Sequence, residues 1–192
     1  MSKDLYEEFP YIVANGIIIR KMTENDADAL MELCNSEAVY RYAPDFMITK
    51  NRKAVIRNIA QICGRDFEKK RYIIAGGCLQ DYPDYIIATA EIFGYDRIVN
   101  MVEIGYRINE KYWNRGIATK LIQTMIGYLF EEIGINRIQA KVMPENTYSA
   151  KALLKNGFIK EGVIRQGNFW KGKGVVDLEM YSVLRADYMK SK

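Results

Sequence analysis

The stretch that decides the fold is Glu103-Ile-Gly-Tyr-Arg-Ile-Asn-Glu-Lys-Tyr-Trp-Asn-Arg-Gly-Ile-Ala-Thr119. Its first six residues predict a strand, and a helix opens on small residues at its end. The first amides of a helix lack hydrogen-bond partners, and the helix dipole favours negative charge there. Because Gly116 and Ala118 leave those amides open to close approach, this turn can bind an anion such as a pyrophosphate.

The residues around the glycine strengthen this interpretation without settling it. Arg115 and Lys120 flank the turn and can contact phosphate oxygens, while Thr119 offers a hydroxyl. The alternative is that Gly116 only permits a tight turn. The spacing is neither that of a Walker loop nor that of a dinucleotide fingerprint.

Upstream of this stretch, the pattern predicts a strand, two helices and three further strands. We expect the first helix to be capped from within Thr23 to Asp26, and the three strands to pair antiparallel with breaks at Gly76-Gly77, at Pro83 and at the turn from 96 to 100. The expected strands are 16–20, 71–75, 85–93 and 101–108, and the expected helices lie at 28–35 and within 49–70.

Downstream, an apolar stripe of helical period begins at Ile117, and Gly134 can end that helix. A strand over 137–142 follows, then a short helix to about Asn156 and a hairpin over 158–184 that turns near Gly172 to Gly174. This order implies a mixed α/β fold with a strand-helix-strand crossover near its middle.

Composition narrows the class of protein. The chain has 192 residues, of which 49% are hydrophobic and 27% charged, as expected for one globular domain over 1–192 with a core of about 16–184. No apolar stretch approaches the roughly 18 to 20 residues that span a bilayer, so we expect no membrane partner and a cytoplasmic location. The net charge of +4 comes from interspersed residues, which disfavours nucleic-acid binding as the main role.

The reactive side chains are limited. There is no histidine, so acid and base work falls to carboxylates, tyrosine, serine or lysine. The cysteines, Cys34, Cys63 and Cys78, are far apart and lack metal-ligand spacing, which predicts packing residues and no metal site.

Two separated segments resemble the GNAT N-acetyltransferase superfamily. Trp113-Asn-Arg-Gly-Ile-Ala118 is similar to its acetyl-CoA signature, with Trp113 in place of Gln or Arg as in the branch of ribosomal-protein serine and alanine N-acetyltransferases. The segment from Pro144 to Phe158 resembles the family's Glu-Asn-x-x-Ser, helix and Gly-Phe pattern. The resemblance implies a mixed α+β fold, with a central, mostly antiparallel twisted sheet whose strands splay and are flanked by helices.

The resemblance also implies acetyl-CoA as co-substrate. Pantetheine would pair with the free strand edge, pyrophosphate would lie on the helix amides, and Asn146 and Ser149 would face the pantetheine arm and the thiol. Helix capping by Asn146 and a tolerated helical serine are the alternatives. The expected binding residues are Ile104, Tyr106, Arg107 and Ile108 on the strand, Arg115, Gly116, Ile117, Ala118 and Thr119 at the turn, and Asn146 and Ser149.

Catalytic candidates follow from the chemistry of amine acetylation. A backbone amide near Tyr106 or Arg107 could polarise the thioester carbonyl. Glu103 resembles the glutamate that serves as base in histone-type members, although pairing with a lysine or arginine across the sheet is an equal alternative. Ser149 is the candidate acid, because Leu153 stands where many members have a tyrosine.

Several classes of amine could accept the acetyl group. An α-amine has a lower pKa than a lysine amine, so a larger fraction of it is neutral at pH 7 and a weak base is sufficient. Together with the resemblance, this favours a protein N-terminus of ribosomal type over polyamines or aminoglycosides. The alternative outside the enzymes is a module that binds CoA without catalysing a reaction and acts as a sensor or interaction domain. We expect the protein to be a monomer or a homodimer. The residues expected to form the acceptor walls are Tyr40, Arg41, Tyr42 and Asp45 on one side, and the hairpin over 166–174 on the other.

Overall fold

The β-branched and alternating runs of the chain assemble into one twisted sheet in the computed structural model, which describes residues 3–42, 51–170 and 172–190. Over these residues the sheet has eight strands in the order β1-β2-β3-β4-β5-β6-β8-β7. All neighbouring strands are antiparallel except β5 and β6. The strands are β1 (Ile12–Ala14), β2 (Ile17–Arg20), β3 (Tyr72–Leu79), β4 (Tyr82–Asp96), β5 (Met101–Ile108), β6 (Arg137–Val142), β7 (Ile159–Trp170) and β8 (Gly174–Leu184).

Short polar side chains begin the helices. Asn51 and Asn146 each accept a hydrogen bond from a backbone amide of the first turn, and Gly134 ends the central helix with a φ of 78°. No helix among the described residues is long and apolar enough to cross a bilayer. The helices are α1 (Ala27–Cys34), α2 (Glu37–Tyr40), α3 (Arg52–Ala60), α4 (Ile117–Gly127), α5 (Thr147–Lys155) and α6 (Arg185–Lys190), with short turns η1 (Glu24–Asp26) and η3 (Glu110–Tyr112) and π-helical extensions η2 (Gln61–Asp66) and η4 (Tyr128–Ile133).

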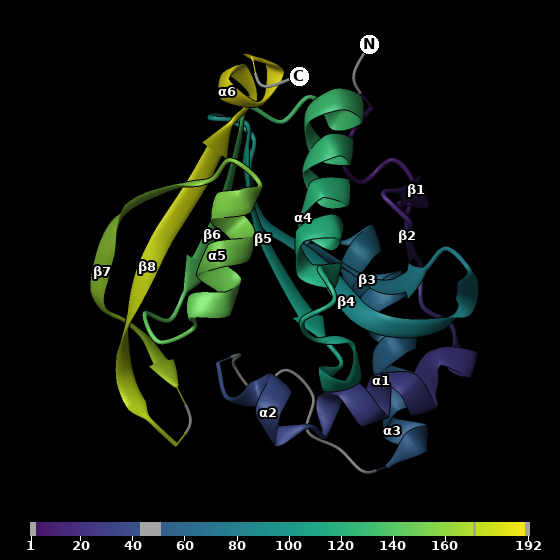
Figure 1. Cartoon of the computed structure of the whole chain (residues 1–192). Helices are drawn as coiled ribbons and strands as arrows, with labels where there is room; N and C mark the ends of the chain where they lie inside the picture. Colours follow the sequence, from purple (N-terminus) through teal and green to yellow (C-terminus); the bar gives the residue numbers. More distant parts are fainter. Residues whose placement is uncertain (1–2, 43–50, 171, 191–192) are drawn as a thin grey trace.

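The sheet is covered on both faces, as Figure 1 shows. One face packs against α4, η4 and α5 around a core that includes Leu121, Met125 and Phe130. The other face packs against α1, α3 and η2 around Leu30 and Val55. Alternation along the central strands β3 and β4 therefore buries both sets of side chains over most of β3 and the middle of β4, which explains their near-continuous apolar runs.

Most predicted elements are confirmed, but two predicted breaks are wrong. Gly76 and Gly77 lie inside β3 because the sheet packs too closely there for a side chain: a Cβ on Gly76 would come 2.6 Å from Cγ2 of Ile86. Pro83 lies within β4, at its exposed beginning, where the missing amide is tolerated. The two strands are separated instead by the tight turn between Leu79 and Tyr82.

The feature that positions the site is a gap in the middle of the sheet. β5 and β6 are parallel and pair only through Met101–Arg137, Val102–Ile138 and Glu103–Gln139. Beyond Glu103 the described part of β5 has no partner on β6, and the two strands diverge (Figure 1). The splay that the resemblance implies is therefore present, with α4 as the crossover between the two strands.

Candidate acetyl transfer site

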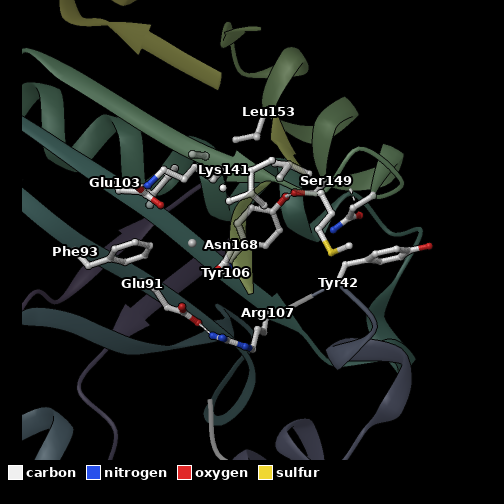
Figure 2. Close-up of a pocket in the computed structure, with 18 of the residues that line it drawn as sticks. Tyr42, Glu91, Phe93, Glu103, Tyr106, Arg107, Lys141, Ser149, Leu153 and Asn168 are labelled. Atoms are coloured by element: carbon white, nitrogen blue, oxygen red, sulfur yellow. Dashed lines mark hydrogen bonds and ion pairs between the residues drawn. The ribbon is translucent and has the colours of Figure 1, made fainter. Parts of the chain in front are cut away.

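A cavity of about 350 Å³ occupies the gap between β5 and β6. Its walls come from β4 and β5 on one side, β6 and α5 on the other, and the β7–β8 hairpin (Figure 2). This volume is within the range of small-molecule sites. The lining residues are Tyr42, Glu91, Phe93, Glu103, Ile104, Gly105, Tyr106, Arg107, Ala140, Lys141, Val142, Met143, Asn146, Ser149, Leu153, Gly167, Asn168, Trp170 and Leu178.

Alternation along β5 divides the cavity into two sides. Ile104 and Ile108 are buried in the core beneath α4, and Tyr106 points the same way toward α5. Glu103 and Arg107 point to the opposite face, where they meet charged groups of neighbouring strands. One side of the gap therefore carries hydroxyls, and the other carries ion pairs.

The N-terminus of α4 is open to a ligand. Gly116 is the N-cap with a φ of 73°, and a Cβ placed there would meet no atom within 4 Å. Arg115 is exposed beside it, whereas the side chain of Ile117 is buried in the core, so Ile117 can offer only its backbone. Ala118 and Thr119 are half-buried in the first turn. This arrangement has the donors that a pyrophosphate requires.

Trp113 has a structural reason to replace the more usual Gln or Arg. Its Nε1 donates a 2.8 Å hydrogen bond to the carbonyl oxygen of Ile108, which ties the loop to the end of β5. The guanidinium of Arg115 lies over the ring of Tyr112, 5.6 Å from its centroid. These two contacts fix the loop that leads into Gly116.

Asn146 and Ser149 are brought together at the start of α5. The side chain of Asn146 accepts a 3.2 Å hydrogen bond from the amide of Ser149, so the capping alternative describes its contact. The hydroxyl of Ser149 lies 2.8 Å from the hydroxyl of Tyr106. Burial raises the pKa of Tyr106 to about 12, with a smaller opposing effect of the Ser149 hydrogen bond.

Glu103 is held in the gap by two neighbours on β6. Lys141 Nζ lies 2.8 Å from Glu103 Oε2, and Gln139 Nε2 donates to the same oxygen at 3.1 Å. The carboxylate is 12% exposed. The contact is thus the cross-sheet ion pair that the sequence left open, and a role as base stays a prediction.

A second ion pair was missed from the sequence. Arg107 and Glu91 form a close, buried ion pair on the same side as Glu103, and the hydroxyl of Thr89 donates to Glu91 at 2.8 Å. The available signal was Glu91 itself, a charged residue in the otherwise apolar run of β4. Arg107 was predicted only as a backbone contact.

The two predicted acceptor walls meet the cavity in part. Tyr42 and the hairpin residues Asn168 and Trp170 line it, and Lys173 at the hairpin tip lies 4.9 Å from the ring centroid of Tyr42. The guanidinium carbon of Arg107 lies 5.7 Å from the centroid of the Tyr40 ring. Arg41 is exposed, and Asp45 lies outside the described residues.

The cysteines play no visible part in this site. Cys34, Cys63 and Cys78 are buried, and burial raises the pKa of each thiol, which disfavours the nucleophilic thiolate. Within the residues that the structure describes, acidic and cysteine side chains form no cluster of the kind that binds a metal ion.

Comparison with known proteins agrees with this geometry. Residues 17–159 match the family model described as an acetyltransferase (GNAT) domain. The chain is 31% identical over 174 residues to an N-acetyltransferase designated p20 of Bacillus licheniformis, covering 90% of this chain and 94% of that protein. It is 28% identical over 86 residues to the ribosomal-protein-serine acetyltransferase of Escherichia coli, covering 45% of this chain and 48% of that enzyme.

A solved structure supports the same assignment. A GNAT-family acetyltransferase from Bacillus anthracis superposes with a TM-score of 0.79 at 25% identity, covering 92% of this chain and 99% of that one. The splayed strands, the open helix N-terminus and the Asn-x-x-Ser start of α5 are the features at which the sequence resemblance predicts acetyl-CoA binding. The chain therefore belongs to the GNAT acetyltransferase family and is an acetyl-CoA-dependent N-acetyltransferase.

Proposed function

We propose that the acceptor is the α-amine of a protein N-terminus, with ribosomal-protein termini as the first candidates. The observation that carries this proposal is that both carboxylates on the ion-pair side of the gap are already engaged by cations. Glu91 is ion-paired with Arg107, and Glu103 with Lys141. Because each carboxylate already binds a cation, neither is free to pair with a charged ammonium group, so the site suits an amine that is partly neutral before it binds.

The acid-base properties of amines separate the candidates. An α-amine with a pKa near 8 is neutral about one time in ten at pH 7, whereas a lysine amine near 10.4 is neutral less than about one time in a thousand. The advantage of the α-amine is therefore a few hundred-fold before any contact is made. The chain contains no histidine to compensate.

The shape of the cavity and one relative give further support. At about 350 Å³ the cavity admits a small group or a thin, extended segment, and a folded surface is too large for it. The Escherichia coli relative is a ribosomal-protein-serine acetyltransferase by name. Polyamines and aminoglycosides are the alternative acceptors, because they are also thin enough to enter.

The proposal assigns roles along the gap. The amides of Arg115 to Thr119 would hold the pyrophosphate, and the free edge of Ile104 to Ile108 would pair with pantetheine. An amide at Tyr106 or Arg107 would donate to the thioester oxygen as negative charge develops on it. Glu103 would accept the proton of the amine through a water molecule, and Ser149 would donate to the departing thiolate.

The test is thiol release from acetyl-CoA with matched acceptors. One peptide has a free α-amine and no lysine, and its partner has a blocked N-terminus and a single lysine; a polyamine and an aminoglycoside complete the set. We expect the free α-amine to react best, with a rate that rises with pH as the amine is deprotonated. Preference for the blocked lysine peptide, the polyamine or the aminoglycoside contradicts the proposed acceptor.

A further inference from the structure

Two hydroxyl groups from different elements meet at the wall of the gap. Tyr106 reaches its hydroxyl from β5 toward α5, and Ser149 reaches back from the first turn of α5 (Figure 2). Their oxygens are 2.8 Å apart, the length of a normal hydrogen bond between hydroxyls. Sequence patterns predicted both residues as cofactor contacts but gave no reason to connect them.

The geometry allows either oxygen to donate, and the chemistry of the pair favours one direction. A phenol is a stronger acid than an aliphatic alcohol, so in a phenol-alcohol pair the phenol is the better donor. Burial disfavours the phenolate, so Tyr106 keeps its proton throughout the physiological range. Tyr106 therefore donates and Ser149 accepts, which leaves the hydrogen of Ser149 pointing away from Tyr106.

The tyrosine is held rigidly enough to have this effect. Its ring packs against the core beneath α4, and the backbone of Tyr106 lies opposite Ala90 in the antiparallel ladder of β4 and β5. Ser149 is held by a hydrogen bond that its backbone N–H donates to Oδ1 of Asn146. Two anchored hydroxyls polarise each other, which strengthens the outward hydrogen bond of the second one.

The other hydroxyls of α5, on Thr147 and Tyr148, do not line the cavity, and Thr147 is exposed. Leu153, one turn after Ser149, is fully buried at the cavity wall. Tyr148 is 75% exposed and on a different face of the helix. The hydroxyl that supports Ser149 comes from the sheet.

We propose that Tyr106 is a positioning residue that directs the hydroxyl hydrogen of Ser149 toward the CoA sulfur as the thiolate departs. This inference rests on the proposed place of the thiol at Ser149. In the step itself, the C–N bond forms, the C–S bond breaks, and its electron pair leaves on sulfur. The proton lost by the amine passes through water to Glu103, the thiolate takes up a proton from water, and both hydroxyls keep their own protons.

The first test is a double-mutant cycle on thiol release, with whichever amine of the acceptor set reacts best. Tyr106→Phe keeps the ring and should lower kcat about tenfold, with KM for acetyl-CoA changed less than about twofold. In a Ser149→Ala background the same change should have no further effect, because Tyr106 acts through Ser149. Tyr72→Phe, which removes a hydroxyl that donates to Asp66 outside the cavity, is the matched control and should keep kcat.

A second measurement does not depend on the acceptor. The thiolate absorbance of CoA bound to the enzyme, titrated against pH, gives the pKa of the bound thiol. We expect this pKa to lie below that of free CoA, and to rise by about half to one unit in Tyr106→Phe and in Ser149→Ala. An unchanged thiol pKa in Tyr106→Phe, or additive losses of kcat in the double variant, overturns the inference. Reaction with a lysine or polyamine instead of an α-amine overturns only the proposed acceptor.

Discussion

Replacing Gly116 with alanine separates two effects at the start of α4, strain in the fold and loss of the anion site. Gly116 has a φ of 73°, where a residue with a Cβ costs about 1 to 2 kcal/mol. The added Cβ meets no protein atom within 4 Å, so no clash adds to this cost. For a chain of 192 residues, Tm should fall by about 2 to 8 °C.

The same Cβ projects into the space that the pyrophosphate is proposed to occupy. Each charge-assisted hydrogen bond from an amide to a phosphate oxygen contributes about 1.5 to 3 kcal/mol, so losing one raises the Kd of CoA about 10- to 150-fold. Calorimetric titration of CoA into the folded variant measures this. Gly172→Ala is the matched control, since Gly172 has a φ of 85° and equally open surroundings in the hairpin turn. An increase in Kd no larger than that of the control would refute the assignment of the anion site.

Three further changes test the charged groups. Glu103→Gln should lower kcat for the preferred amine about 100-fold if the carboxylate is the base. Glu161→Gln, which changes a carboxylate outside the cavity, is the control. Equal initial rates for the two variants at every pH would exclude Glu103 as the base. The hydrogen bond from Arg137 lowers the pKa of Glu161 from 4.5 to about 2. The stabilisation from this ion pair is therefore present above pH 4.5 and disappears as pH falls toward about 2. Because Glu161 is 40% exposed, Glu161→Gln should lower the free energy of unfolding in urea by at most about 1 kcal/mol at neutral pH. An equal loss at low pH would contradict the link between this pKa and stability. Arg107→Met leaves Glu91 buried without its cation and should cost about 3 to 5 kcal/mol in the same assay, whereas an unchanged midpoint would show that the pair adds nothing.

Much of the fold could be read from the sequence because local signals and packing agree. The strand over 101–108 and the strand over 137–142 have the predicted bounds, since apolar alternation and turn residues coincide at their ends. β1, α2 and α6 were not predicted, because elements of three to six residues carry too little periodicity. Gly76 was misread because its small size serves close packing inside the sheet, which only the tertiary structure reveals.

In the candidate site, local features could be predicted from the sequence and contacts between distant segments could not. The open helix N-terminus at Gly116 could be predicted because the glycine turn is a local signal, and its role in binding stays a prediction. Contacts between distant segments were not predicted: Ser149 and Tyr106 are 43 residues apart, and Glu103 meets Lys141 across 38 residues. Pairing of this kind depends on which strands lie side by side, and a single sequence leaves that open.

The gap between β5 and β6 has a consequence for the behaviour of the free protein. An unpaired strand edge is a template on which another chain can add a strand, and here such an edge lies in the middle of the sheet. α5 lines it on one face and the β7–β8 hairpin on the other, and the space between them holds only about 350 Å³. The edge is therefore reachable by a pantetheine arm or by the end of an extended segment, whereas a space of this size leaves no room for a whole strand to pair along it. The narrow space that fits a thin ligand also limits strand addition, which is the route by which unpaired edges lead to aggregation.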